Sequence, residues 1–229
     1  MEKPVVKKAK APIASIILTV FAMFGVFCSL GLDIVPGFLP DYALPSGITY
    51  YARFGFSALL SSLRLIGMLV FLVGLFLYRK KGNILCGAGV ALNVANLILS
   101  IFSNITSLVT NPTNPASPLF FIFTELLIAA FLIVAAVFYF TEIKALGMPL
   151  KFIFGLVAII LAFVSAGGAS FITTRVFTEM MGYTADIEGF FYTFMHVPHI
   201  TFSVLSSVVY AFTSLWFYLA IVLFTPKKG

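Results

Sequence analysis

The fold class of this chain is decided by one uncharged stretch, Gly82–Thr124, which reads GNILCGAGVALNVANLILSIFSNITSLVTNPTNPASPLFFIFT. About 20 apolar residues suffice to cross the hydrocarbon core of a bilayer, so the stretch holds one membrane-spanning helix and the beginning of another. Pro112, Pro115 and Pro118 separate the two, because proline lacks a backbone donor and disfavours helix in the residue before it. The sequence therefore predicts two membrane spans joined by a short turn.

The composition of the whole chain supports this interpretation. Of its 229 residues, 61% are hydrophobic and 10% are charged, and the mean hydropathy is +1.11. Typical soluble domains are about a quarter charged, so this chain has too few ionic groups to cover the surface of a soluble protein. The apolar runs are longer than the roughly 9–11 residues of a barrel strand, and helices satisfy their own backbone groups in lipid. We therefore predict an all-α polytopic membrane protein.

Six segments are long and apolar enough to span a membrane. Two of them carry a charge, Arg64 in the second segment and Glu125 in the fourth. We expect residues 1–229 to form a single six-helix transmembrane domain, in which residues 1–12 are a basic cytoplasmic tail. The predicted spans are Ile13–Leu32, Phe54–Tyr78, Ile84–Val109, Leu119–Phe140, Phe152–Thr174 and Ile200–Phe224.

Lysine and arginine are distributed unevenly between the two sides of these spans. With the N-terminus in the cytoplasm, the opposite side receives only Arg53 and Arg175 of the 14 basic residues. Cytoplasmic connections of membrane proteins carry an excess of basic residues, so both termini are predicted to be cytoplasmic, in a plasma or inner membrane. The basic residues then placed on the cytoplasmic side are Lys3, Lys7, Lys8, Lys10, Arg79, Lys80, Lys81, Lys144, Lys151, Lys227 and Lys228.

The same basic clusters indicate which partners the chain has. Because they lie beside the spans, they predict contact with anionic lipid headgroups on the cytoplasmic side. They do not predict nucleic-acid binding, because no aromatic platform is interleaved with them. The 27 phenylalanines and the short connections also suit contact with other membrane subunits.

Arg64 is the most informative residue, because it lies ten residues into the second span and close to the bilayer midplane. An arginine at that depth costs about 2.5–3.5 kcal/mol on insertion scales, so it must face protein or water and have a partner. Arg53, Ser57 and Ser61 share its helical face, which descends from the outer surface. Glu125 lies within about one helical turn of Arg64 in depth. We expect the two to form an ion pair, which either binds a substrate or proton or fixes helix packing.

Two further spans carry polar stripes at helical spacing, and we expect these to converge on Arg64. The stripes either line a polar cavity or form packed interfaces in which small and amide residues hydrogen-bond between helices. Asn93 and Asn96 are harder to assign to packing, because amides near mid-depth need partners. The stripes comprise Asn93, Asn96, Ser100, Ser103, Asn104 and Ser107 in the third span, and His196, Ser203, Ser207, Tyr210 and Ser214 at and within the sixth.

His196 and His199 are weak candidates for metal ligands. Pro198 disturbs the helix that would align them, and no HExxH pattern is present. We therefore predict neither a metal site nor a cofactor. The outer connection that contains them, residues 175–199, is aromatic and lightly charged. We expect it to lie in the membrane interface or to fold back over the bundle mouth as a lid.

The leading functional hypothesis is a transport or solute-binding subunit with an outward-facing polar cavity. Arg64 would hold an anionic or carbonyl group, and Glu125 would balance the charge or carry a proton. The alternative is a structural or assembly subunit of a larger membrane complex, with tightly packed polar stripes. An intramembrane enzyme is the weakest hypothesis, because we cannot assemble a nucleophile–base pair or metal triad. The candidate substrate-binding residues are Arg53, Ser61, Arg64, Asn93, Asn96, Ser100, Glu125 and Tyr210.

Overall fold

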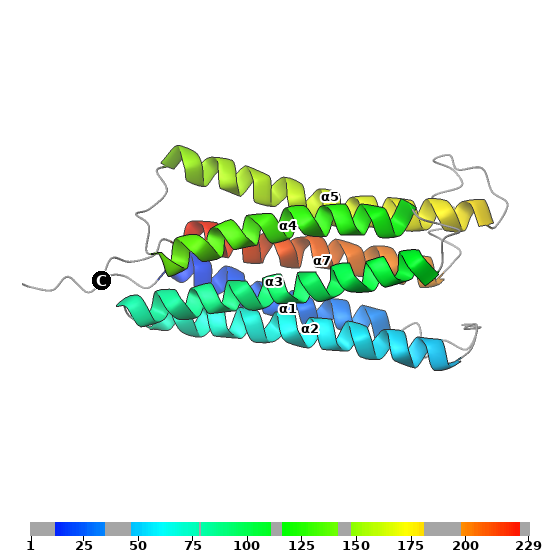
Figure 1. The fold of residues 1–229 in the computed structure, drawn as a ribbon, viewed down its shortest axis with the longest axis horizontal. Helices are drawn as coiled ribbons and strands as arrows, with labels where there is room; N and C mark the ends of the chain where they lie inside the picture. Colours follow the sequence, from blue (N-terminus) through cyan, green and yellow to red (C-terminus); the bar gives the residue numbers. More distant parts are fainter. Residues whose placement is uncertain are drawn as a thin grey trace, which may run out of the picture.

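The computed structural model describes residues 12–34, 47–77, 79–110, 116–141, 148–180 and 198–224. These residues form six helices (Figure 1), and no strand occurs among them. The helices are α1 (Ile13–Ile34), α2 (Gly47–Phe76), α3 (Arg79–Thr110), α4 (Ala116–Phe140), α5 (Met148–Met180) and α7 (Pro198–Leu223). The all-α class predicted from the sequence is confirmed.

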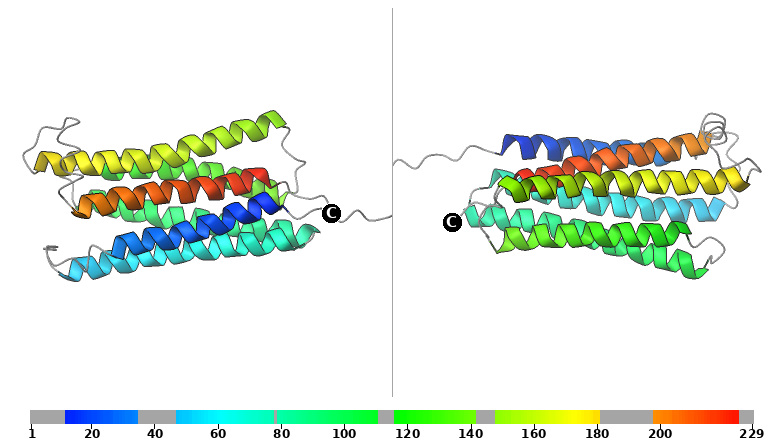
Figure 2. Two further views of the ribbon diagram at one scale, coloured as in Figure 1. Left: turned by 180° about the vertical axis from the view of Figure 1, so that it is seen from behind. Right: turned by 90° about the horizontal axis from the view of Figure 1, so that it is seen from above.

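The six helices lie side by side and alternate in direction (Figures 1 and 2). Each helix packs against the next one along the chain, and the ring closes where α7 packs against α1. The start of α1 and the end of α7 therefore lie at the same end of the bundle, which we call the terminal end. The opposite end, where α2 and α7 begin, is called the distal end.

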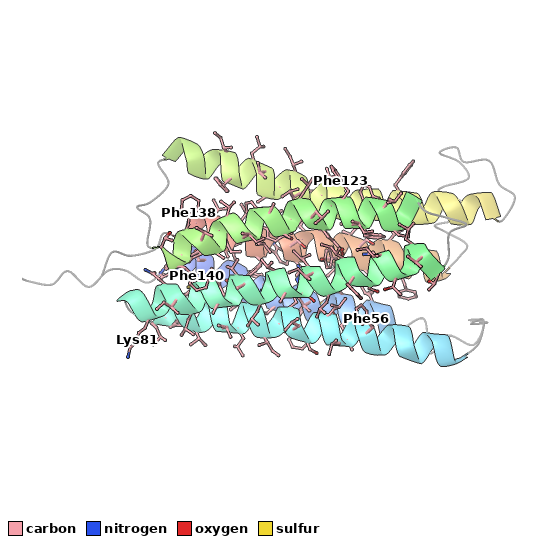
Figure 3. All side chains as sticks on the ribbon, viewed as in Figure 1. Phe56, Lys81, Phe123, Phe138 and Phe140 are labelled. Carbon is pink, nitrogen blue, oxygen red and sulfur yellow. The ribbon has the colours of Figure 1, made fainter. Side chains whose placement is uncertain are left out.

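The outside of the bundle is apolar. Phe24, Phe102 and Phe123 are 65%, 71% and 63% exposed, and they belong to three different helices. Figure 3 shows such side chains along the outer faces, together with Lys81 at the terminal end. Acyl chains accommodate a surface of this kind, whereas a soluble monomer rarely exposes large contiguous apolar patches.

Five of the helices contain a segment long and apolar enough to cross a membrane. The described apolar segment of α5, Ile153–Gly168, is shorter. A membrane-embedded helical bundle is therefore supported by length and composition, while a span formed by α5 and the cytoplasmic orientation of the termini stay predictions. The five segments are Ile13–Leu32, Ala58–Phe76, Lys81–Thr110, Pro118–Phe140 and Val204–Leu223.

Helix α5 runs to Met180, so it includes the first residues of the predicted outer connection. Residues 181–197, with His196 among them, lie outside the described residues, as do residues 1–11 of the predicted tail. Helix α7 begins at Pro198. Proline suits the first turn of a helix, because its missing N–H would have no intrahelical partner there.

Helices α2 and α3 approach each other closely along what we call the glycine seam, which consists of Gly67, Gly74, Gly82 and Gly89. A Cβ added to Gly89 would lie 2.5 Å from the carbonyl oxygen of Gly67, and one added to Gly74 would lie 2.9 Å from that of Gly82. On each helix the glycines are seven residues apart, which places them on one face about two turns apart. The backbones therefore meet directly, as small residues allow in membrane helix pairs.

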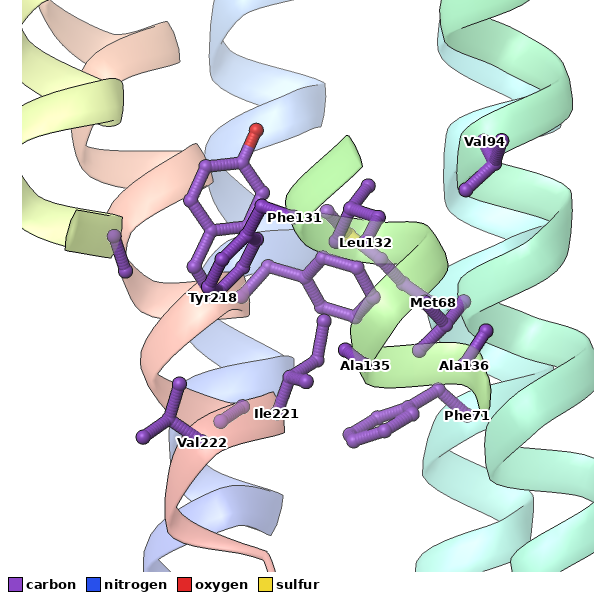
Figure 4. Close-up of a cluster of buried hydrophobic side chains, with 14 of the residues drawn as sticks. Met68, Phe71, Val94, Phe131, Leu132, Ala135, Ala136, Tyr218, Ile221 and Val222 are labelled. Atoms are coloured by element: carbon purple, nitrogen blue, oxygen red, sulfur yellow. The ribbon is translucent and has the colours of Figure 1, made fainter. Parts of the chain in front are cut away.

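The interior toward the terminal end is filled by what we call the aromatic core, which consists of Phe71, Phe131, Tyr139, Phe217 and Tyr218. Figure 4 shows three of these side chains, Phe71, Phe131 and Tyr218. Phe71 makes edge-to-face contacts with Phe217 and Tyr139, with ring centroids 5.5 Å and 5.9 Å apart. The Tyr139 hydroxyl donates a hydrogen bond to the carbonyl oxygen of Ile221 at 2.7 Å. Aromatic pairs of this kind contribute about 0.5–1.5 kcal/mol each beyond their buried area. They tie α2, α4 and α7 together across the ring.

Candidate functional site

Arg64 lies in the interior next to the aromatic core, on its distal side, and is 7% exposed. Its Nη2 donates to Ser214 Oγ at 2.9 Å, and its guanidinium carbon lies 4.3 Å from the centroid of the Tyr210 ring. Both partners belong to α7, so the side chain reaches across the interior from α2. Arg64 therefore faces protein and has partners on another helix, as the cost of a lipid-exposed arginine requires.

The predicted partner of Arg64 was wrong. Glu125 accepts hydrogen bonds from Ser100 Oγ at 2.6 Å and from Asn104 Nδ2 at 3.2 Å, both on α3. Among the described side chains, no ion pair joins Glu125 to Arg64. Matched depth predicted the pair, but depth does not determine the direction in which a side chain leaves its helix. Glu125 turns toward the adjacent α3, and Arg64 turns toward α7.

Tyr218 connects the surroundings of the two charges. It follows Ser214, the partner of Arg64, by one turn of α7, and its ring packs against Phe131 of α4, the helix that carries Glu125. Figure 4 shows Tyr218 beside Phe131 of α4, at the edge of the aromatic core to which both belong. Arg64 and Glu125 thus border a common region of the interior, although each is bonded to a different helix. We call this region the polar layer, and it comprises Arg64, Asn96, Ser100, Asn104, Glu125, Tyr210 and Ser214.

The two predicted amides of α3 have different surroundings. Asn93 Nδ2 donates to the carbonyl oxygen of Gly89 at 2.9 Å and lies against Gly67, so it belongs to the glycine seam. Asn96 is 8% exposed, and its buried Oδ1 has no hydrogen-bond donor among the described residues. Because α2 and α3 are antiparallel and Asn93 faces Gly67, Asn96 lies opposite the turn of α2 that carries Arg64.

The remaining predicted residues are placed less completely. Ser61 is half-buried on α2, one turn from Arg64, and Tyr210 is half-buried beneath the guanidinium. Arg53 falls within α2 and His199 within α7, but their side chains lie outside the described part of the chain. Within the described residues, no group of three or more His, Cys, Asp and Glu side chains could hold a metal ion.

Two residues of the polar layer and one beside it were not predicted as site residues. Ser214 and Asn104 belong to the predicted polar stripes, but the sequence assigned them no role. Tyr218 was not predicted, because a tyrosine in an apolar helix is usually a residue of the aromatic core. Helical spacing contained the missing signal, since Ser214 precedes Tyr218 by four residues and follows Tyr210 by four. Residues four apart lie on one helical face, so the three hydroxyls share a stripe.

The polar layer can bind oxygen atoms at one point and N–H or O–H groups at another. A guanidinium has five N–H donors in a planar fork, which matches carboxylate and phosphate oxygens. An ionised carboxylate and an amide oxygen only accept hydrogen bonds, so Glu125 and the Asn96 Oδ1 atom suit donors. No protein-family model, curated protein or solved structure matches the chain, so its function is inferred from this geometry.

Proposed function

We propose that the protein is an integral membrane transport or solute-binding subunit whose ligand binds in the polar layer. The observation that carries the proposal is the environment of Arg64, whose partners among the described residues are a hydroxyl and an aromatic ring and not a carboxylate. A guanidinium that served only to fix helix packing would be stabilised most by a buried counter-charge. Neutral partners position the Arg64 guanidinium while leaving its charge available to a ligand.

The topology of the proposal follows the distribution of basic residues. Helix α5, with 33 residues, completes the set of six spans, because a helix of that length extends about 50 Å. The terminal end lies on the cytoplasmic side of a plasma or inner membrane, where Lys81 contacts anionic lipid headgroups. In this proposal the polar layer opens as a cavity toward the distal end.

The test compares two variants that remove one positive charge each. Arg64→Gln is expected to weaken solute binding at least tenfold, because hydrogen bonds to charged groups contribute about 1.5–3 kcal/mol. Lys81→Gln is the matched control, because Lys81 is exposed at the terminal end, away from the polar layer. The full chain in detergent is screened for thermal stabilisation by small carboxylates, amides, amines and zwitterions, and each hit is measured by equilibrium dialysis.

Two outcomes would contradict the proposal. The first is a screen in which no solute stabilises the wild-type chain. The second is a set of hits that bind Arg64→Gln as tightly as the wild type, since the polar layer would then not be the binding site.

A structural or assembly subunit is the second candidate, and the surface of α5 favours it. Ala158, Ala162 and Ala166 form the buried row of this helix, while Ile160 and Val164 are about half exposed. Such a helix offers a large apolar face to a neighbouring subunit as well as to lipid. Mass spectrometry of the chain released from its native membrane in mild detergent distinguishes the two, because an assembly subunit must retain another polypeptide.

A further inference from the structure

Two opposite charges lie apart in the interior of this protein. Arg64 is bonded to α7 and Glu125 to α3, and the structure describes one other charged side chain, that of Lys81. Lys81 is exposed at the terminal end. Within the described part of the bundle, one positive group is buried and one negative group is part-buried, each with neutral hydrogen-bond partners.

Separation of this kind is costly in a medium of low dielectric constant. Removing a charged group from water costs several kcal/mol, and a close counter-charge is the usual way to recover part of it. Arg64 lies opposite the turn of α3 that carries Asn96, and Ser100, one turn further along α3, donates to Glu125, so the two charges border the same region. Their hydrogen bonds to α7 and α3 nevertheless keep them from meeting. A ligand that carries both signs of charge would neutralise both groups at once.

Asn96 supplies an independent observation. Its Oδ1 is buried, has no donor among the described residues, and lies on the turn of α3 opposite Arg64. A buried acceptor without a donor costs about 1–3 kcal/mol, so the site is incomplete as it stands. A carboxylate cannot satisfy this atom, because it has no proton to donate. An ammonium group can, because it has three N–H donors and Glu125 does not need all of them.

We propose that the ligand of the polar layer is a small zwitterion with a carboxylate and an ammonium group, that is, a free amino acid or a close analogue. The carboxylate binds Arg64, and the ammonium group binds Glu125 and the Asn96 Oδ1 atom. This inference rests on the proposed binding function. A simple anion would leave Glu125 uncompensated, and a simple cation would leave Arg64 uncompensated.

The experiment compares matched probes on the full chain in lipid nanodiscs. Each of the twenty common amino acids is first tested at 1 mM for thermal stabilisation, a concentration chosen as roughly the upper end of typical substrate affinities. The best binder is then compared by calorimetry with its deaminated analogue and with its decarboxylated analogue. Both analogues are expected to bind at least about tenfold more weakly, because each loses hydrogen bonds to a charged group. This comparison uses only the wild-type chain, so it does not depend on the folding of a variant.

Variants assign the two ends of the ligand. Glu125→Gln is expected to abolish the preference for the amino acid over its deaminated analogue, and Arg64→Gln the preference over its decarboxylated analogue. The inference is overturned if no amino acid binds, or if the wild type binds an analogue as tightly as the amino acid. If another class of solute binds and requires Arg64, the inference fails while the proposed function stands. If no binding depends on Arg64, both fail.

Discussion

The aromatic core and the polar layer lie in the same interior, and α2, α4 and α7 contribute to both, yet the two are built differently. In the core, rings from different helices touch directly, and the Tyr139 hydroxyl has its acceptor. In the polar layer, each charge is held by neutral groups, and the Asn96 Oδ1 atom has no donor among the described residues. The difference indicates that the core stabilises the bundle and that the layer is arranged for a ligand.

The largest effect is expected at the glycine seam, because separating α2 from α3 disturbs the aromatic core and the polar layer together. Gly89→Leu introduces a side chain where even a Cβ would lie 2.5 Å from the Gly67 carbonyl oxygen and the Phe71 backbone nitrogen. Because both of these atoms are backbone, α2 and α3 must separate, and we expect little monodisperse protein on size-exclusion chromatography. Gly155→Leu is the control, since nothing lies within 4 Å of the added Cβ there. Equal yields of the two variants would show that the glycine seam is dispensable.

A large loss of stability without a loss of binding affinity is expected in the aromatic core. Phe71→Ala removes the ring that contacts Phe217 and Tyr139, and such truncations of buried residues cost about 3–5 kcal/mol. The midpoint of thermal unfolding should fall, while the dissociation constant of the solute stays within about twofold for the folded fraction. A much weaker affinity at unchanged stability would reverse the assignment of the two regions.

The opposite result, a gain of stability with a loss of binding affinity, is expected in the polar layer. Asn96→Leu removes a buried acceptor that has no donor among the described residues, so the midpoint of thermal unfolding should rise, by the equivalent of about 1–3 kcal/mol. The same change should weaken amino-acid binding, because the ammonium group loses an acceptor. Asn93→Leu is the contrasting variant, since Asn93 donates to Gly89 within the seam, and it should lower the midpoint. A lower midpoint for Asn96→Leu would mean that the amide has a structural partner.

The smallest effect is expected from a single hydroxyl in the aromatic core. Tyr139→Phe keeps the ring and removes the hydrogen bond to Ile221, so stability should fall by about 0.5–1.5 kcal/mol. Solute affinity should be unchanged, because the hydroxyl lies outside the polar layer. Chemical denaturation followed by the fluorescence of Trp216, the one tryptophan in the chain, measures the change. A drop in solute affinity with unchanged stability would extend the binding region into the core.

The helices themselves were largely predictable. The predicted first span, Ile13–Leu32, differs from α1 only by the two residues that extend the helix to Ile34. The prolines between Asn111 and Pro118 separate α3 and α4 as expected, because proline disfavours helix in the residue before it. The burial of Arg64 was also predictable, since exposing a guanidinium to acyl chains near mid-depth is costly whichever helix it contacts instead.

The contacts between helices were not predictable in the same way. The seven-residue spacing of Gly67 and Gly74, and of Gly82 and Gly89, is visible in the sequence, but their pairing depends on the register of α2 against α3. The wrong partner predicted for Glu125 has the same origin. Counting residues gives the depth of a side chain in the membrane, but it does not identify the helix that the side chain contacts. Asn93 bonds to Gly89 within its own helix, whereas the Asn96 Oδ1 atom has no donor among the described residues, so only the second outcome depends on what the neighbouring helices place opposite it.

Hydropathy, length and the positions of proline and charge determined that this chain is a bundle of membrane helices with a guanidinium in its interior. These properties depend on the transfer of groups between water and lipid, which is a property of each segment by itself. The tertiary structure decided that Arg64 bonds to α7, that Glu125 bonds to α3, and that one amide oxygen lacks a donor among the described residues. These outcomes depend on the rotation and register of helices about one another, which no segment specifies alone.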